Sequence, residues 1–158
     1  MAGNAPMGRT DTRLDRAELL CRKRGVQLTS LRRKVLGLVM DSAKPMGAYD
    51  LLDRLRLGHK GAAPPTVYRA LGFLLEHGLI HKIESLSAFV GCIHACDRGE
   101  LSFHSAQFLL CARCGRAEEL EDPDIDLALA RAARRRDFAL NHTTIEAKGT
   151  CAACAVEA

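Results

Sequence analysis

Tryptophan is absent from this chain, and aromatic residues make up only 4% of its 158 residues. Aliphatic side chains must therefore fill any core, and a hydrophobic share of 47% is enough to build one and to exclude a chain disordered by composition. No apolar run approaches the roughly 18 residues that span a bilayer. Residues 1–11 also lack the apolar segment of a signal peptide. We therefore expect a cytoplasmic protein with no membrane partner.

The chain also lacks the short motifs of several common enzyme classes. It contains no G-x-S-x-G turn, no H-E-x-x-H motif and no glycine-rich phosphate loop. We therefore do not expect an enzyme, nor a small-molecule substrate other than a metal ion. A metalloenzyme or thiol oxidoreductase is a distant alternative, and so is a zinc-storage protein that does not bind DNA.

Cysteine, in contrast, is well represented, and four of the seven cysteines form two C-x-x-C pairs. Cys111 pairs with Cys114, and Cys151 pairs with Cys154. In a reducing compartment, such pairs bind metal more often than they form disulfides. Four thiolates match the closed tetrahedral set of a structural Zn²⁺. The alternatives are a redox dithiol or two unrelated buried pairs. Residues 115–150 are enough to form a small folded unit whose two ends the metal joins.

Charge divides the chain into two halves. Residues 1–92 hold 15 Lys and Arg against 8 Asp and Glu, whereas residues 93–158 hold 8 against 11. The net charges are thus +7 and −3, which agree with +4 for the whole chain. A basic N-terminal module suits a phosphate backbone, although an ordinary basic surface gives the same count.

The N-terminal half has the pattern of a winged helix-turn-helix domain. Apolar spacing and end signals predict four helices and then a hairpin, over residues 12–24, 29–42, 48–55 and 65–77, with strands at 79–83 and 88–92. A helix bundle followed by a two-stranded wing is typical of DNA-binding proteins.

The fourth of these helices is the candidate recognition helix. Two prolines open it, which suits a first helical turn. Four apolar residues form its buried stripe: Val67, Leu71, Leu74 and Leu75. Thr66, Tyr68 and Arg69 lie off that stripe, toward solvent or a partner. The guanidinium of Arg69 can grip guanine N7 and O6, and a phosphate contact or a solvated charge is the alternative.

The C-terminal half predicts an α/β unit. We expect strands at residues 102–110, 116–121 and 138–147, and a helix from Asp122 to Arg136. The fold class is therefore α+β. The expected organisation is a disordered tail (1–11), a DNA-binding domain (12–92), a linker (93–101) and a zinc-binding domain (102–158).

A second set of potential metal ligands gathers around the junction of the two halves: His81, Cys92, His94, Cys96, His104, Glu118 and Glu119. One thiolate, two imidazoles and one carboxylate suit Zn²⁺ better than Fe²⁺ or Mn²⁺. Each residue taken singly also has an ordinary structural explanation. A metal held by both halves fixes the angle between them and thereby links metal binding to DNA binding.

Five segments together resemble the ferric uptake regulator family and, within it, the zinc uptake regulator branch: residues 48–52, 65–71, 78–85, 108–115 and 145–154. The resemblance implies a homodimeric cytoplasmic repressor that needs Zn²⁺ to bind operator DNA of zinc-uptake genes. Residues 103–108 lack the His/Asp-rich pattern of the iron branch, which favours zinc. A sibling sensor of another metal or of peroxide is the alternative.

The resemblance also implies roles for individual residues. It makes the Cys111, Cys114, Cys151 and Cys154 quartet a structural zinc site. It makes His81, Cys92, His104 and Glu119 a regulatory zinc site, with Cys96 as an alternative thiolate, so that two Zn²⁺ are expected per chain. Tyr49 and Arg69 match base-contacting positions.

Overall fold

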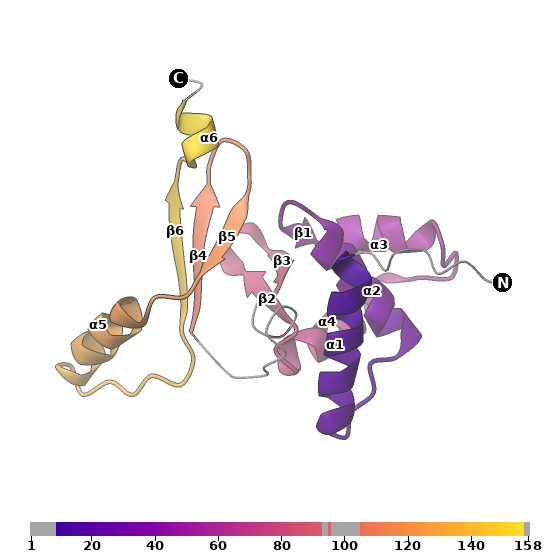
Figure 1. Ribbon diagram of the computed structural model, residues 1–158, viewed down its shortest axis with the longest axis horizontal. Helices are drawn as coiled ribbons and strands as arrows, with labels where there is room; N and C mark the ends of the chain where they lie inside the picture. Colours follow the sequence, from indigo (N-terminus) through magenta and orange to yellow (C-terminus); the bar gives the residue numbers. More distant parts are fainter. Residues whose placement is uncertain (1–8, 93–94, 96–104, 157–158) are drawn as a thin grey trace. The chain divides into compact units, whose positions relative to one another are not determined.

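The computed structural model describes residues 9–92, 95 and 105–156, and the chain divides into two compact units, residues 1–102 and 103–158 (Figure 1). Each unit has its own secondary structure and its own sheet. The prediction of an α+β fold is therefore confirmed. Among the described residues, no helix is both long enough and apolar enough to cross a bilayer.

Unit 1 is a helical bundle with a small sheet. Its elements are α1 (Arg9–Lys23), α2 (Ser30–Asp41), β1 (Met46–Gly47), α3 (Ala48–Arg56), α4 (Pro64–Glu76), β2 (Ile80–Ile83), a 3₁₀ turn (Glu84–Leu86) and β3 (Ala88–Gly91). The strands form an antiparallel sheet in the order β1-β3-β2. The four helices and the hairpin expected for a winged helix-turn-helix are all present.

Helix α1 begins earlier than the sequence suggested. It starts at Arg9 and therefore includes residues 9–11 of the segment for which we expected no regular structure. Thr10 explains part of this, because its hydroxyl donates to the Asp41 carboxylate across 2.6 Å and ties the start of α1 to the end of α2. This bond joins residues far apart in sequence and leaves no local pattern.

Helices α1 and α2 pack through an apolar seam that ion pairs border. Ala17 and Cys21 of α1 and Val35 of α2 are completely buried. Beside them, the Arg33 guanidinium contacts Asp15 at 2.6 Å and Glu18 at 3.1 Å. These side chains are partly exposed, so each pair is worth under about 1 kcal/mol, and apolar burial holds the helices together.

Helix α4 packs with the stripe that its sequence predicts. Val67, Leu71 and Leu74 are at most 2% exposed, and Leu75 is half-buried. Pro64 is the first helical residue, as a first-turn proline should be. The Arg32 guanidinium of α2 lies 3.7 Å from the centre of the Phe73 ring, a cation–π contact that fixes α4 against α2.

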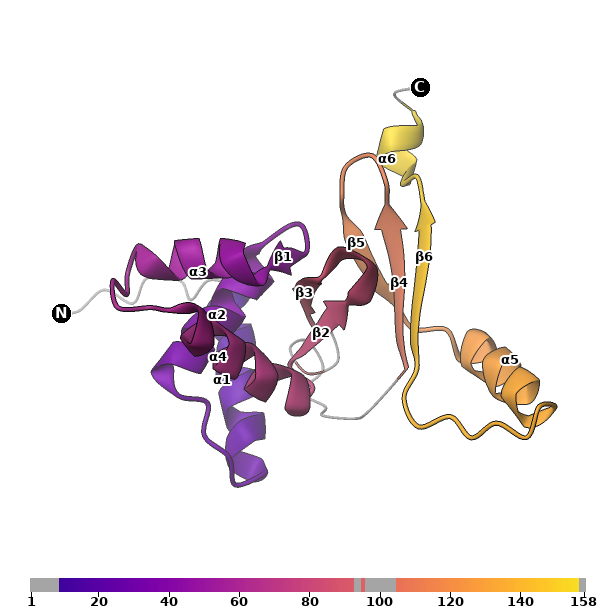
Figure 2. The same ribbon diagram turned by 180° about the vertical axis from the view of Figure 1, so that it is seen from behind.

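Unit 2 is a three-stranded sheet with one long helix. Its elements are β4 (Ala106–Cys111), β5 (Ala117–Leu120), α5 (Pro123–Arg134), β6 (Thr144–Gly149) and α6 (Ala152–Ala155). Strand β4 lies in the middle, antiparallel to β5 and parallel to β6. Parallel neighbours need a crossover connection, and α5 provides it (Figure 2).

The expected strand at 138–147 is wrong in its first half. Strand β6 begins at Thr144, and residues 138–140 lie in the connection from α5, with Phe138 66% exposed. Asp137 has a positive φ of 52°, which ends the helical path. The chain must then return along the whole length of α5 before it can run parallel to β4, and residues 138–143 are used for that return.

Candidate metal centre and DNA-binding face

The four cysteines of the two C-x-x-C pairs lie together at one end of the unit 2 sheet. Cys111 is the last residue of β4, Cys151 is the N-cap of α6 and Cys154 lies within α6. The ligand atoms of Cys111, Cys114, Cys151 and Cys154 all lie within 4.8 Å of one another. The structure thus brings together the quartet that the sequence predicted.

Sheet register explains how the two pairs meet. In the parallel pairing of β4 with β6, Cys111 lies opposite Gly149, two residues before Cys151. The Ala112 N–H then donates to the Gly149 carbonyl across 2.9 Å. Gly115, at φ +73°, closes the first turn by donating its N–H to the Cys111 carbonyl. Both turns therefore present their thiols at the same end of adjacent strands.

The sulfur spacing fits a tetrahedral zinc ion. The Cys114 and Cys151 Sγ atoms are 3.8 Å apart. Zn–S bonds of about 2.3 Å in a tetrahedron place sulfurs about 3.8 Å from one another. Four thiolates with this spacing are the donor set that a closed structural zinc site requires, so the residues present fit the ion.

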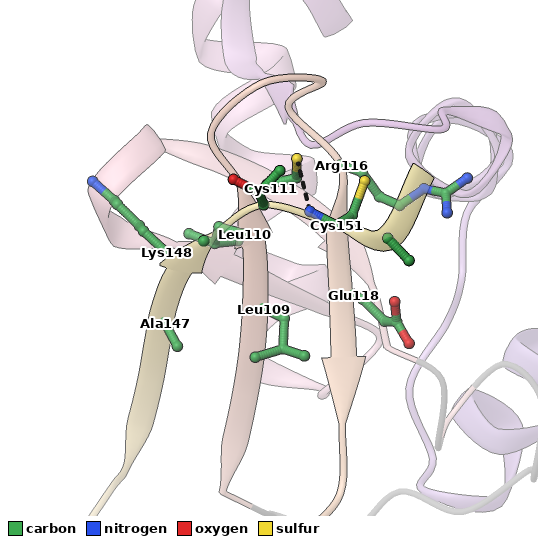
Figure 3. Close-up of a pocket in the computed structure, with 11 residues that line it drawn as sticks. Leu109, Leu110, Cys111, Arg116, Glu118, Ala147, Lys148 and Cys151 are labelled. Carbon is green, nitrogen blue, oxygen red and sulfur yellow. Dashed lines mark hydrogen bonds between the residues drawn. The ribbon is translucent and has the colours of Figure 1, made fainter. Parts of the chain in front are cut away.

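Backbone amides favour the thiolate of Cys111. Amide hydrogen bonds from Cys114 and then Cys151 lower the pKa of Cys111 to about 6. The second of these bonds, from the Cys151 N–H to the Cys111 Sγ at 3.3 Å, is the dashed line in Figure 3. Hydrogen bonding with Cys151 and burial raise the pKa of Cys154 to about 12. At neutral pH, metal binding must therefore displace a proton from Cys154 but not from Cys111.

Arg113 adds a link that sequence reasoning missed. Its Nη1 donates to the Cys154 carbonyl across 2.5 Å, so a side chain of the first turn holds the backbone of the second. The only signal in the sequence is a cation inside the first C-x-x-C pair. A positive charge here also offsets part of the negative charge that four thiolates bring together.

A hollow of about 340 Å³ lies on the sheet next to the quartet. Leu109, Glu118 and Ala147 line it on adjacent strands, because Leu109 pairs with Glu118 on β5 and with Ala147 on β6 (Figure 3). Leu109 is 49% exposed, and Ala147 is also exposed. This sheet face therefore carries apolar surface that unit 2 itself leaves uncovered.

Unit 1 brings two of the expected regulatory ligands together. The Cys92 N–H donates to the Leu79 carbonyl across 3.0 Å, which places Cys92 beside the start of β2. His81 is the second residue of β2. Ligand atoms of His81 and Cys92 lie within 4.8 Å of each other, His81 half-buried and Cys92 buried.

The remaining expected ligands belong to other parts of the chain. Glu119 lies on β5 of unit 2, opposite Phe108, and is half-buried, whereas its neighbour Glu118 is exposed. His104 and the alternative thiolate Cys96 lie outside the residues that the structure describes, and so does His94. The complete set of His81, Cys92, His104 and Glu119 stays a prediction.

The expected DNA contacts lie on the surface of unit 1. Tyr49 at the start of α3 is 70% exposed, and Tyr68 on α4 is 52% exposed. Arg69 is also exposed and Thr66 is half-buried, both on α4. Since the opposite side of α4 is buried against α2 and α3, the side that carries these residues is the one available to a partner.

The model of the "Ferric uptake regulator family" matches residues 23–148. The chain is 43% identical over 145 residues to the zinc uptake regulation protein of Escherichia coli (strain K12), and the match covers 92% of this chain and 82% of that protein.

Two solved structures are also similar. A zinc uptake regulator complexed with zinc and DNA aligns with a TM-score of 0.87 at 40% identity, covering 94% of this chain and 96% of the other. A crystal structure of holo XcZur aligns with a TM-score of 0.80 at 44% identity, covering 90% of this chain and 96% of the other.

Proposed function

Because this chain belongs to the ferric uptake regulator family, we propose that it is a zinc-responsive DNA-binding regulator that mainly represses zinc-uptake genes. The observation that carries the proposal is the likeness, over nine-tenths of the chain, to a regulator solved with zinc and DNA. The cysteine quartet and the exposed face of α4 are the features that such a regulator needs.

We propose two zinc sites in each chain. The quartet of Cys111, Cys114, Cys151 and Cys154 is the structural site, a role that its closed donor set supports. His81, Cys92, His104 and Glu119 form the regulatory site, with Cys96 as the alternative thiolate. The short distance between the ligand atoms of His81 and Cys92 supports this assignment.

The proposed regulatory site takes its ligands from both units. His81 and Cys92 belong to unit 1, and Glu119 belongs to unit 2. Ligands from both units on one ion restrict the angle between them. A ligand that favours one arrangement by about 5.5 kcal/mol moves its population from 1:99 to 99:1. Zinc binding and DNA binding are then linked, each strengthening the other.

The proposed DNA contacts lie on the surface of α3 and α4. Arg69 and Tyr49 contact base edges, and Thr66 and Tyr68 complete the surface that enters the major groove. The net charge of +7 in residues 1–92 favours the approach of this unit to a phosphate backbone.

We propose that the working form is a cytoplasmic homodimer joined through unit 2. Strand β6 is an outer strand of its sheet, with β4 as its neighbour there. Large exposed apolar residues lie on the same unit: Leu109, Leu127, Phe138 and Leu140. A second copy can extend the sheet at β6 and cover such residues, which explains why so much apolar surface stays open in one chain.

Metal-specific DNA binding tests the function. Protein whose regulatory site has been freed of metal is titrated with Zn²⁺, Mn²⁺ or Fe²⁺. Its binding to duplexes from zinc-uptake promoters is followed by fluorescence anisotropy. We expect tight, sequence-specific binding with Zn²⁺ at the lowest free metal concentration. Preferential activation by Fe²⁺ or Mn²⁺, or loss of binding on peroxide treatment alone, supports the alternative of a sibling sensor.

A further inference from the structure

The segment that leads into α4 carries positive charge without any acidic residue. Residues 54–75 contain no Asp or Glu, and their cations are Arg54, Arg56, Lys60 and Arg69. Residues 26–40, which include most of α2, likewise contain no acid and carry Arg32, Arg33 and Lys34. Arg33 pairs with Asp15 and Glu18 of α1, and Arg56 pairs with Asp53. The cations of these two segments that no such pair includes are Arg32, Lys34, Arg54, Lys60 and Arg69, so both segments keep a net positive charge.

Hydrogen bonds fix the loop between α3 and α4, which Figure 2 shows running back from the end of α3 to the start of α4. The Gly58 N–H donates to the Leu55 carbonyl, and the Ala62 N–H donates to the His59 carbonyl. Arg56 Nε also donates to the Ala62 carbonyl across 3.2 Å. His59 and Lys60 are exposed between these anchors, so their positions relative to α4 are defined.

Lys34 of α2 reaches this loop. A Cβ atom added at Gly58 would lie 2.7 Å from Lys34 Nζ, so the ammonium group lies directly against the loop backbone. Glycine at position 58 leaves the space that the ammonium group occupies. Lys34 is exposed, as is Lys60 two residues after Gly58. A cation from α2 and a cation from the loop therefore border the same stretch of backbone.

The start of α4 itself is a poor anion site. A helix N-terminus usually offers free N–H groups to a phosphate. Here Pro64 and Pro65 have no N–H, and the N–H groups of Thr66 and Val67 both donate to the Ala63 carbonyl. A phosphate that lies beside this end of α4 must therefore be bound by side chains.

We propose that Lys34 and Lys60 together bind a DNA backbone phosphate beside the start of α4. The inference rests on the proposed DNA-binding function and adds two residues to it. Contacts to phosphate fix the register of a protein on the duplex, whereas contacts to bases read sequence. The anchored loop thus holds α4 at the depth and register from which Arg69 reaches base edges.

Salt dependence of duplex binding tests this inference. Each phosphate that a cation neutralises contributes about −0.9 to the slope of log Kobs against log salt. We expect Lys60→Gln and Lys34→Gln each to reduce the magnitude of that slope by up to about 0.9. This reduction of the slope should be equal on operator and non-operator duplexes. Lys60→Arg should keep the wild-type slope, and thermal unfolding checks that each variant is folded.

Two controls separate the outcomes. Lys23→Gln removes the same charge from the exposed end of α1 and should leave the slope unchanged. Arg69→Ala should reduce discrimination between operator and non-operator duplexes. Wild-type slopes in the Lys34 and Lys60 variants overturn the inference and leave the proposed function intact. If the zinc-loaded wild-type protein binds no duplex at all, the proposed function itself fails.

Discussion

Gln107 of β4 hydrogen-bonds the backbone of Asp122 in both directions. Its Nε2 donates to the Asp122 carbonyl at 3.1 Å, and its Oε1 accepts from the Asp122 N–H at 3.3 Å. Nε2 also donates to the Asp126 carboxylate at 2.8 Å. Gln107 is only 1% exposed, so this buried amide joins the central strand of unit 2 to the start of α5.

Replacing this amide should destabilise unit 2. Gln107→Leu keeps the approximate size of the side chain but removes the acceptor of the Asp122 N–H. The Asp122 carbonyl then keeps only the longer bond from the Asp126 N–H at 3.4 Å. We expect a loss of about 1–3 kcal/mol in the free energy of unfolding, measured by urea denaturation of the zinc-loaded protein. Gln27→Leu, the same change at an exposed position, is the matched control. Equal stability of the two variants would refute a structural role for Gln107.

Loss of one quartet thiol should affect the fold rather than only the metal response. Cys111→Ser removes a ligand from the site that joins the two ends of unit 2, so we expect loss of one zinc per chain and loss of dimer. Zinc content and mass by light scattering measure both. Cys21→Ala removes a thiol outside the quartet, and this variant should keep the zinc of the quartet. A Cys111→Ser dimer of unchanged thermal stability contradicts the assignment.

The quartet should titrate unevenly in metal-free protein that circular dichroism shows to be still folded. The pKa of Cys111 is lowered to about 6, so its thiolate stabilises the folded state. This contribution is complete above the pKa of an unfolded cysteine, about 8.5, and is lost as pH falls through 6. Thiolate absorbance should therefore rise by one group near pH 6, and Cys111→Ser should remove that step. Cys154→Ser should keep this step. Loss of the step near pH 6 in Cys154→Ser would show that the low pKa does not belong to Cys111.

Gly72 offers a stabilising change on the exposed side of α4. It lies one helical turn after Tyr68 and Arg69, is exposed, and a Cβ there meets no atom within 4 Å. Gly72→Ala should therefore raise the free energy of unfolding by about 0.5–1 kcal/mol, since glycine weakens a helix interior. Urea denaturation measures it, and a destabilised variant contradicts the packing described for α4.

The sequence predicted those features that residues close together in the chain determine. The apolar spacing of Val67, Leu71 and Leu74 and the prolines before them determine α4, and the spacing of the cysteines predicts the quartet. Other features depend on partners far away in the chain. The two-residue β1 exists because Met46 and Gly47 pair with β3, and the start of β6 depends on the length of α5. Arg113 could not be recognised because its acceptor, the Cys154 carbonyl, is a backbone atom.

We propose that zinc bound by residues of both units controls DNA binding. Zinc content per chain, before and after mild chelation, tests it most directly when the same samples are assayed for operator binding and mass. We predict two zinc ions falling to one, with loss of operator binding and retention of the dimer. A single zinc ion throughout, with operator binding unaffected by chelation, would contradict the regulatory role of His81, Cys92, His104 and Glu119.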